Sequence, residues 1–126
     1  MCGIAGFFSP SGITDEPLAR HLMTQMRDRL VHRGPDDAGI WIDRDGGLAF
    51  GFRRLSIIDL SEAGHQPMLS ACGRYAIDFN GEIYNFQDMR AEIEQARGPH
   101  PWRSHSDTEV LVEAVAQWGF ESAIRR

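Results

Sequence analysis

The second residue of the chain is a cysteine, Cys2, and Gly3 follows it. If Met1 is removed, Cys2 becomes the first residue and carries both a thiol and a free α-amine. A thiol becomes a strong nucleophile once a base has taken its proton, and an adjacent amine can act as that base. The pair is suited to nucleophilic catalysis. The alternative is that Cys2 is only a small apolar residue at the start of a strand.

The absence of lysine narrows the choice of catalytic bases. All 13 basic residues are arginines. Schiff-base and pyridoxal-phosphate chemistry and the lysine of a phosphate-binding loop are therefore excluded for this chain. Arginine stays protonated up to about pH 12, whereas an α-amine titrates near pH 8. Only the first residue can supply a neutral amine base near neutral pH.

A second candidate is the run Asn80-Gly81-Glu82, which follows an apolar segment. Asn-Gly is above all a turn signal. The functional alternative is that the amide of Asn80 and the backbone N–H of Gly81 point at one oxygen. Acyl transfer needs such donors for its tetrahedral oxyanion, and losing one costs about 3–4 kcal/mol of barrier.

Two further features suggest a site for a zwitterion. Arg53 and Arg54 lie in an apolar segment, where an arginine can hold a carboxylate through two hydrogen bonds or serve as an edge or ion-pair residue. Asp107 is either an acid favoured by the dipole of a helix or an acceptor for a substrate ammonium group. The five histidines show none of the usual metal-binding spacings.

Composition indicates one globular domain with a core. The chain has 126 residues, 42% of them hydrophobic, and a net charge of −5. The negative net charge argues against binding to nucleic acid or to an anionic membrane. We see no signal peptide or membrane span, and two cysteines are too few for a disulfide framework. We therefore expect a cytoplasmic location.

The order of the predicted elements indicates an α+β layered fold. Strands are expected at residues 3–8, 38–42, 47–52, 55–60 and 74–79, and helices at 17–32, from 85 to Gly98, and from 107 to Gly119. In the first helix, an apolar stripe should face the core: Leu18, Leu22, Met26 and Leu30, with Met23 alongside. In the second helix, Phe86, Met89 and Ile93 should face inward. The third begins at a capping box, Ser106 to Glu109.

Six segments, taken together in their order, carry a specific resemblance. They are Met1-Cys2-Gly3-Ile4-Ala5-Gly6, His32-Arg33-Gly34-Pro35-Asp36-Asp37, Arg54-Leu55-Ser56-Ile57-Ile58-Asp59, Gly64-His65-Gln66-Pro67-Met68, Phe79-Asn80-Gly81-Glu82-Ile83-Tyr84-Asn85 and Ser106-Asp107-Thr108-Glu109-Val110. Over nearly its whole length the chain resembles the N-terminal glutaminase domain of glutamine-hydrolysing asparagine synthetases. The resemblance implies a class II glutamine amidotransferase domain and the αββα sandwich of N-terminal-nucleophile hydrolases, incomplete at its C-terminus.

The resemblance also assigns roles to individual residues. Cys2 would be the nucleophile, and its own α-amine would be the base. Asn80 and Gly81 would form the oxyanion hole. Arg54 would hold the α-carboxylate of glutamine, and Glu82 and Asp107 its ammonium group. The backbone of four residues would line the pocket: Leu55, Ser56, Ile57 and Ile58.

The implied reaction is hydrolysis of L-glutamine to glutamate and ammonia through a thioester. The ammonia would go to an ATP-dependent synthetase domain or partner subunit, which amidates aspartate or a similar carboxylate. No cofactor is expected in this domain. The resemblance implies that residues 1–126 are a truncated glutamine amidotransferase domain and that a synthetase domain, absent from this sequence, would follow it. ATP and Mg²⁺ would belong to that synthetase domain. A homodimer is compatible with this reading. The alternative is a catalytically silent glutamine-binding or assembly module, inactive through truncation or because Met1 is retained.

Overall fold

The computed structural model describes residues 1–56 and 61–126. They form two compact units, each built from segments that are separated along the chain. Unit 1 contains the described residues 1–56, 65–67 and 78–80, and unit 2 contains 61–64, 68–77 and 81–126.

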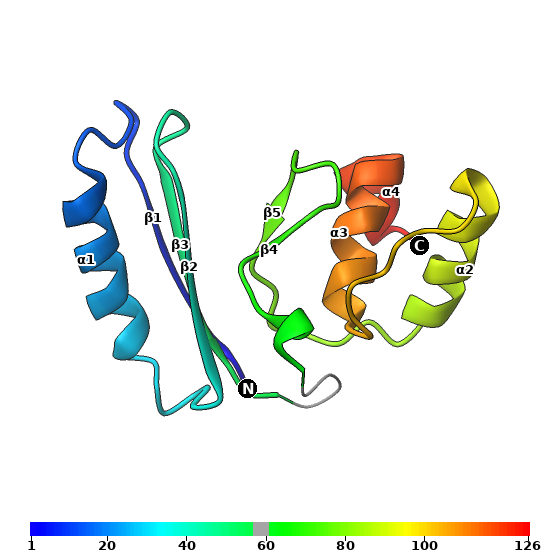
Figure 1. Cartoon of the computed structure of the whole chain (residues 1–126), viewed down its shortest axis with the longest axis horizontal. Coiled ribbons are helices and arrows are strands. Elements are labelled where there is room, and N and C mark those ends of the chain that lie inside the picture. Colours follow the sequence, from blue (N-terminus) through cyan, green and yellow to red (C-terminus); the bar gives the residue numbers. More distant parts are fainter. Residues whose placement is uncertain (57–60) are drawn as a thin grey trace. The chain divides into compact units, whose positions relative to one another are not determined.

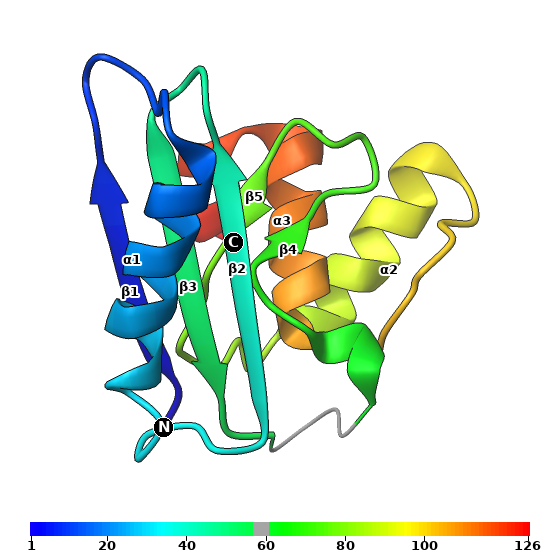
Figure 2. The ribbon, with the colours of Figure 1, turned by 60° about the vertical axis from the view of Figure 1, so that its left-hand side comes forward.

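Unit 1 is a three-stranded antiparallel sheet covered on one face by a helix. Its strands are β1 (Gly3–Phe8), β2 (Asp37–Asp43) and β3 (Leu48–Arg54), in the order β1-β3-β2. The helix α1 (Glu16–Asp28) lies along this sheet (Figures 1 and 2). The three strands predicted in this part of the chain are confirmed. Because β1 runs antiparallel to β3, the start of β1 lies opposite the end of β3, and Gly3 pairs with Arg53.

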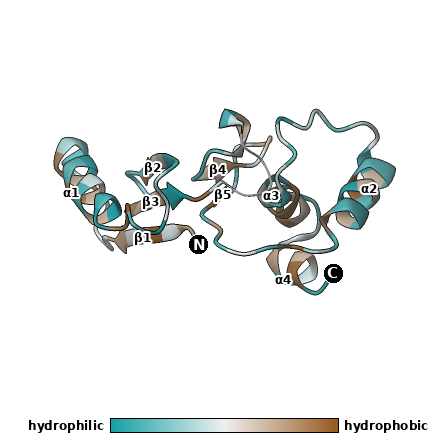
Figure 3. Cartoon of the chain, turned by 90° about the horizontal axis from the view of Figure 1, so that it is seen from below, coloured by the Kyte–Doolittle hydropathy of each residue, from teal (hydrophilic) through white to brown (hydrophobic). Residues whose placement is uncertain are grey.

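The predicted core stripe of the first helix is wrong for three of its residues, whereas the burial of Met23 is confirmed. Leu18, Leu22 and Met26 are 52%, 44% and 38% exposed, and the helix buries Met23 together with Ala19. The sheet selects this face, because a Cβ on Gly51 would lie 2.9 Å from the Met23 methyl carbon. α1 can therefore approach β3 closely along its Met23 side. Figure 3 shows α1 as mostly hydrophilic, whereas β1 carries hydrophobic residues.

The first helix also ends earlier than predicted. It stops at Asp28, and the chain then makes tight turns in which Leu30 donates to the carbonyl of Arg27 and Arg33 to that of Leu30. It begins at Glu16, one residue before the predicted start, and the Asp15 carboxylate caps it by accepting from the backbone nitrogen of Leu18 at 2.9 Å.

Two predicted strands are shorter than expected or are not seen. The segment 74–79 contributes only β5 (Ala76–Ile77), which pairs with β4 (Met68–Leu69) in a two-stranded antiparallel sheet. In the predicted strand 55–60, Leu55 and Ser56 are not in a strand, and residues 57–60 lie outside the described part. The backbone nitrogen of Ser56 donates to the Asp36 carboxylate at 2.8 Å, so a side chain takes the place of a strand partner.

Unit 2 packs helices around one apolar cluster. The helices are α2 (Phe86–Arg97), α3 (Asp107–Trp118) and α4 (Phe120–Ile124), with a short 3-10 turn, η1 (Glu62–Gly64), before them. The buried cluster consists of Met89, Ile93, Val110, Ala114, Val115 and Ala123, and Phe86 packs against it. The predicted inward face of the second helix is thus confirmed. Gly98 and Gly119, with φ of 83° and 81°, end α2 and α3.

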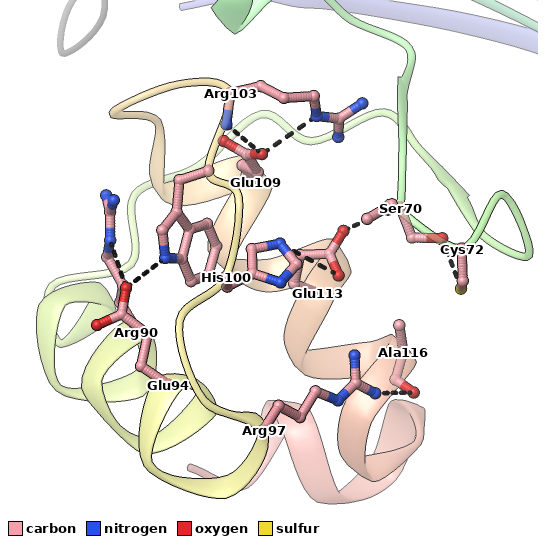
Figure 4. A network of polar contacts seen from close by, with 12 residues as sticks. Ser70, Cys72, Arg90, Glu94, Arg97, His100, Arg103, Glu109, Glu113 and Ala116 are labelled. Atoms are coloured by element: carbon pink, nitrogen blue, oxygen red, sulfur yellow. Dashed lines mark hydrogen bonds and ion pairs between the residues drawn. The ribbon is translucent and has the colours of Figure 1, made fainter.

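Of the capping box predicted at the start of α3, the Ser106 cap is confirmed, whereas the Glu109 contact is wrong. The Ser106 hydroxyl accepts from the backbone nitrogen of Thr108 at 3.2 Å, as an N-cap should. Glu109, however, accepts from the backbone nitrogens of Arg103 and Ser104, and so it ties the preceding loop to the helix. Figure 4 shows Glu109 facing Arg103. Burial disfavours ionisation of Glu109, but these hydrogen bonds outweigh it and lower its pKa.

These elements confirm the α+β class: small antiparallel sheets and helices in both units. Two packed sheets between helical layers remain a prediction. Among residues 1–56 and 61–126, no helix has the length and apolar character needed to cross a bilayer.

Candidate functional site

The Cys2 thiol lies at the end of β3. Its sulfur accepts from the backbone nitrogen of Leu55 at 3.3 Å and lies 3.6 Å from the carbonyl oxygen of the same residue. The side chain is half-buried. The antiparallel pairing of β1 with β3 explains the contact, because it places the beginning of the chain beside the residue that follows Arg54. The predicted nucleophile and part of the predicted pocket lining therefore touch.

The loop between α1 and β2 holds this arrangement, a role that sequence reasoning missed. Arg33 donates from Nε to the carbonyl oxygen of Cys2 at 3.2 Å. Asp36 donates from its backbone nitrogen to the carbonyl of Arg54 and accepts from Ser56. A Cβ on Gly34 would lie 2.3 Å from the carbonyl oxygen of Arg53, so only glycine permits the loop to pass this close. The run 32–37 contributed to the family resemblance, but taken by itself it indicates only the end of a helix.

The two neighbouring arginines have different surroundings. Arg53 donates from Nε to the carbonyl of Gly34 at 3.0 Å and lies 3.6 Å from the Asp28 carboxylate. It is thus a structural residue on the α1 side. Successive residues of a strand point to opposite faces, so Arg54 belongs to the other face of β3, where it is only 8% exposed. This separation favours Arg54 over Arg53 as the carboxylate-binding candidate.

Asn80 ends a short segment that belongs to unit 1. The backbone nitrogen of Phe79 donates to the Gln66 side-chain oxygen at 2.7 Å, and Asn80 itself is exposed. Nearby, both carboxylate oxygens of Asp78 are buried without a hydrogen-bond partner among the described residues. Burial raises the pKa of Asp78 to about 7. The contribution of Gln66 and the burial of Asp78 had no signal in the residue pattern.

The two predicted ammonium-binding carboxylates belong to unit 2. Asp107 is 5% exposed at the first position of α3, and its carboxylate accepts from the backbone nitrogen of Ile83 at 2.9 Å. Glu82 directly precedes Ile83 and is exposed. The hydrogen bond therefore holds the backbone of Ile83, the residue after Glu82, against the Asp107 carboxylate. It also gives Asp107 a structural task beside any contact with a ligand.

The candidate residues are distributed over both units. Unit 1 contains Cys2, Arg54, Leu55, Ser56 and Asn80; unit 2 contains Gly81, Glu82 and Asp107. The predicted pocket residues Ile57 and Ile58 lie outside the described residues. Unit 1 contains the thiol of Cys2, the buried guanidinium of Arg54 and the exposed amide of Asn80. These chemical groups suit acyl transfer at a ligand that carries a carboxylate.

Unit 2 holds the second thiol and a buried pair of ionisable groups. Cys72 is exposed, and the hydroxyl of Ser70, 3.3 Å from its sulfur, lowers its pKa together with backbone hydrogen bonding at Arg74. In the same region, Nε2 of His100 lies 3.8 Å from the Glu113 carboxylate, and both side chains are almost fully buried (Figure 4). In the part of the chain that the structure describes, no group of three acidic, histidine or cysteine side chains could hold a metal ion.

Comparison with known sequences gives a consistent picture. A family model described as a glutamine amidotransferase domain matches residues 1–126. The chain is 43% identical over 123 residues to the glutamine-hydrolysing asparagine synthetase 1 of Bacillus subtilis, with 98% of this chain and 19% of the relative covered. It is 40% identical to asparagine synthetase 3 of the same organism, with 94% and 18% covered. A putative asparagine synthetase of Mycobacterium tuberculosis is 36% identical, with 96% and 20% covered.

Proposed function

Because the chain belongs to the glutamine amidotransferase domain family, we propose that it hydrolyses L-glutamine to glutamate and ammonia at Cys2. The relatives are named glutamine-hydrolysing asparagine synthetases, and the chain spans 18–20% of their length. For the whole protein we therefore propose that an ATP-dependent synthetase part uses the ammonia to amidate aspartate or a similar carboxylate. A cytoplasmic location and the αββα sandwich belong to the same proposal.

The first chemical step is attack by the sulfur of Cys2. The free α-amine takes the thiol proton, and the thiolate adds to the side-chain amide carbon of glutamine. The Asn80 amide and the Gly81 N–H donate to the resulting oxyanion. The protonated amine then gives its proton to the amide nitrogen, and ammonia leaves a γ-glutamyl thioester behind.

Hydrolysis of the thioester completes the cycle. The neutral α-amine takes a proton from water while the water oxygen attacks the thioester carbonyl. Collapse of the second tetrahedral intermediate releases glutamate and regenerates the thiol. Cys2 and its own amine supply both nucleophile and base, so these steps draw on no cofactor. ATP and Mg²⁺ would serve the synthetase part.

The charged residues complement the zwitterionic head of glutamine. Arg54 pairs with the α-carboxylate, and Glu82 and Asp107 pair with the ammonium group. The backbone of Leu55 and Ser56 lines the side chain of the substrate. The observation that chiefly supports the proposal is the 3.3 Å approach of the Cys2 sulfur to the backbone nitrogen of Leu55, because Leu55 directly follows the residue that we propose as the carboxylate anchor.

The state of the N-terminus decides whether this chemistry can run. With Met1 in place the nitrogen of Cys2 is an amide, which cannot accept the thiol proton. We therefore expect turnover only from protein whose first residue is Cys2. Intact mass identifies the two forms. Protein that retains Met1 should bind glutamine without releasing ammonia, as a silent binding module would.

Ammonia release from L-glutamine by the full-length, Met1-processed protein tests the proposal. Cys2→Ala should abolish it, and Asn80→Ala should lower kcat by about 10²–10³-fold with a small change in KM. Cys72→Ala removes the other thiol and is the matched control, with the activity of the parent. Normal ammonia release by the Cys2→Ala variant would refute the proposed nucleophile.

A further inference from the structure

Gln66 is a buried polar residue whose side chain contacts the backbone beside a proposed oxyanion donor. It is 6% exposed and belongs to the short segment 65–67 of unit 1. Its Oε1 accepts from the backbone nitrogen of Phe79 at 2.7 Å. Phe79 directly precedes Asn80. A hydrogen bond to a buried side chain is costly to break, so it fixes the backbone at this point.

Strand β2 fixes the position of Gln66 in turn. Nδ1 of His65 lies 2.7 Å from the Asp37 carboxylate, at the first residue of the strand. Two residues further on, a Cβ on Gly39 would lie only 1.8 Å from the carbonyl oxygen of Gln66. The segment is therefore attached to β2 by a hydrogen bond between the side chains of His65 and Asp37, and it occupies space that Gly39 leaves open. A continuous set of contacts leads from the sheet through Gln66 to Phe79.

Asn80 depends on its neighbours for its placement, because it is exposed and follows a strand of only two residues. An oxyanion donor is effective only when it is held in place before the reaction, and a displacement of about 1 Å can cost 10²-fold in rate. We infer that Gln66 is a positioning residue for glutamine hydrolysis: it fixes the backbone at Phe79 so that the Asn80 amide stays aimed at the developing oxyanion. This inference rests on the proposed function.

The test is steady-state glutamine hydrolysis by Gln66→Met in the full-length, Met1-processed protein. Methionine fills similar space and removes the acceptor for the Phe79 N–H. We expect kcat to fall about ten- to hundredfold while KM for glutamine stays within about twofold. Gln66→Glu keeps an oxygen acceptor at the same place and should recover most of kcat. Gln25→Met, on the exposed side of α1, is the matched control and should match the parent.

Coupling to Asn80 separates positioning from a general structural role. If Gln66 acts through Asn80, then Gln66→Met should cause no further loss of kcat in an Asn80→Ala background. Asp37→Asn, which weakens the attachment to His65 at a partly exposed site, should lower kcat a few-fold in the parent and not at all in that background. If Gln66→Met does not fold, the kcat values of Asp37→Asn in the two backgrounds still test the inference.

Three results would overturn the inference. The first is a folded Gln66→Met variant with the kcat of the parent, and the second is Gln66→Met lowering kcat in the Asn80→Ala background as much as it does in the parent. The third is an Asp37→Asn variant with the kcat of the parent. A failure of the proposed function looks different, because the parent would then release no ammonia or Cys2→Ala would remain active.

Discussion

The Asp107 carboxylate accepts a hydrogen bond from the backbone nitrogen of Ile83 at 2.9 Å. The buried Asp107, at the start of α3, thereby fixes the backbone of Ile83, the residue after Glu82. Asp107→Asn keeps an oxygen acceptor for Ile83 and removes the negative charge. We expect the thermal midpoint to change little and KM for glutamine to rise about tenfold, because the substrate ammonium loses an ionic partner.

Asp107→Ala removes the hydrogen-bond acceptor as well and serves as the comparison. It should raise KM similarly and also lower stability by about 1–3 kcal/mol, since the Ile83 N–H loses its partner. Thermal melts and glutamine saturation curves measure the two effects separately. Parental KM in both variants would mean that Asp107 has only its structural task.

Arg54 and Arg53 form a matched pair for mutation. Arg54→Ala should raise KM for glutamine at least about tenfold with a smaller effect on kcat, because a charge-assisted contact with the α-carboxylate is lost. Arg53→Ala should leave KM unchanged and destabilise the fold by about 1–3 kcal/mol, because Arg53 bonds the carbonyl of Gly34 and pairs with Asp28. The opposite assignment of the two effects would show that the wrong arginine has been chosen.

Asp78 should make the protein less stable as pH rises. Its folded-state pKa of about 7 lies above the ordinary value of 3.8, because burial disfavours its charge. Between these two values the folded form holds a proton that the unfolded form has lost, so stability falls with pH and levels off above about 7. Asp78→Asn should therefore stabilise the protein at pH 8 by up to about 4 kcal/mol, and much less at pH 4.

Thermal midpoints of the parent and of Asp78→Asn, measured from pH 4 to pH 8, give this difference directly. Asp45→Asn, in the exposed turn between β2 and β3, is the matched control for the loss of a carboxylate. A difference between parent and Asp78→Asn that does not grow with pH would contradict the prediction.

Glu109 should have the opposite dependence on pH. Its pKa is lowered in the fold, so its ionised form stabilises the protein above the unfolded value of 4.5, and this contribution is lost as pH falls through the lower folded value. Glu109→Gln should cost about 1–3 kcal/mol at pH 7, because charge-assisted bonds to Arg103 and Ser104 become neutral ones. Urea unfolding at pH 7 and pH 3.5 should show the penalty shrinking in acid.

Residue types alone predicted the groups for the chemistry but not the contacts that hold them. A cysteine beside an α-amine, an arginine in a strand and an Asn-Gly pair each carry a chemical property that the sequence displays. Arg33, Asp36 and Gln66 instead bond backbone atoms of Cys2, Ser56 and Phe79, which any residue offers. Because the partner leaves no mark on the sequence, the residue pattern assigned these three residues no role of their own.

Packing explains the errors in the helices. α1 carries two apolar stripes, and periodicity cannot decide which one meets the sheet. The open space at Gly51, which lies on another element, decides it in favour of Met23. Similarly, Glu109 fits the capping-box pattern, yet its carboxylate bonds the loop residues Arg103 and Ser104. Local sequence patterns thus predicted the positions of the helices along the chain better than they predicted which residues each helix contacts.

The central claim is that the sulfur of Cys2 carries the glutamyl group, and acid quenching during turnover tests it most directly. Met1-processed protein is mixed with glutamine, quenched within the first turnovers and digested for mass spectrometry. We predict a γ-glutamyl thioester on the peptide that begins with Cys2, and none in the Cys2→Ala variant. A glutamyl adduct on the peptide that contains Cys72, or steady ammonia release with residue 2 unmodified, would contradict the account.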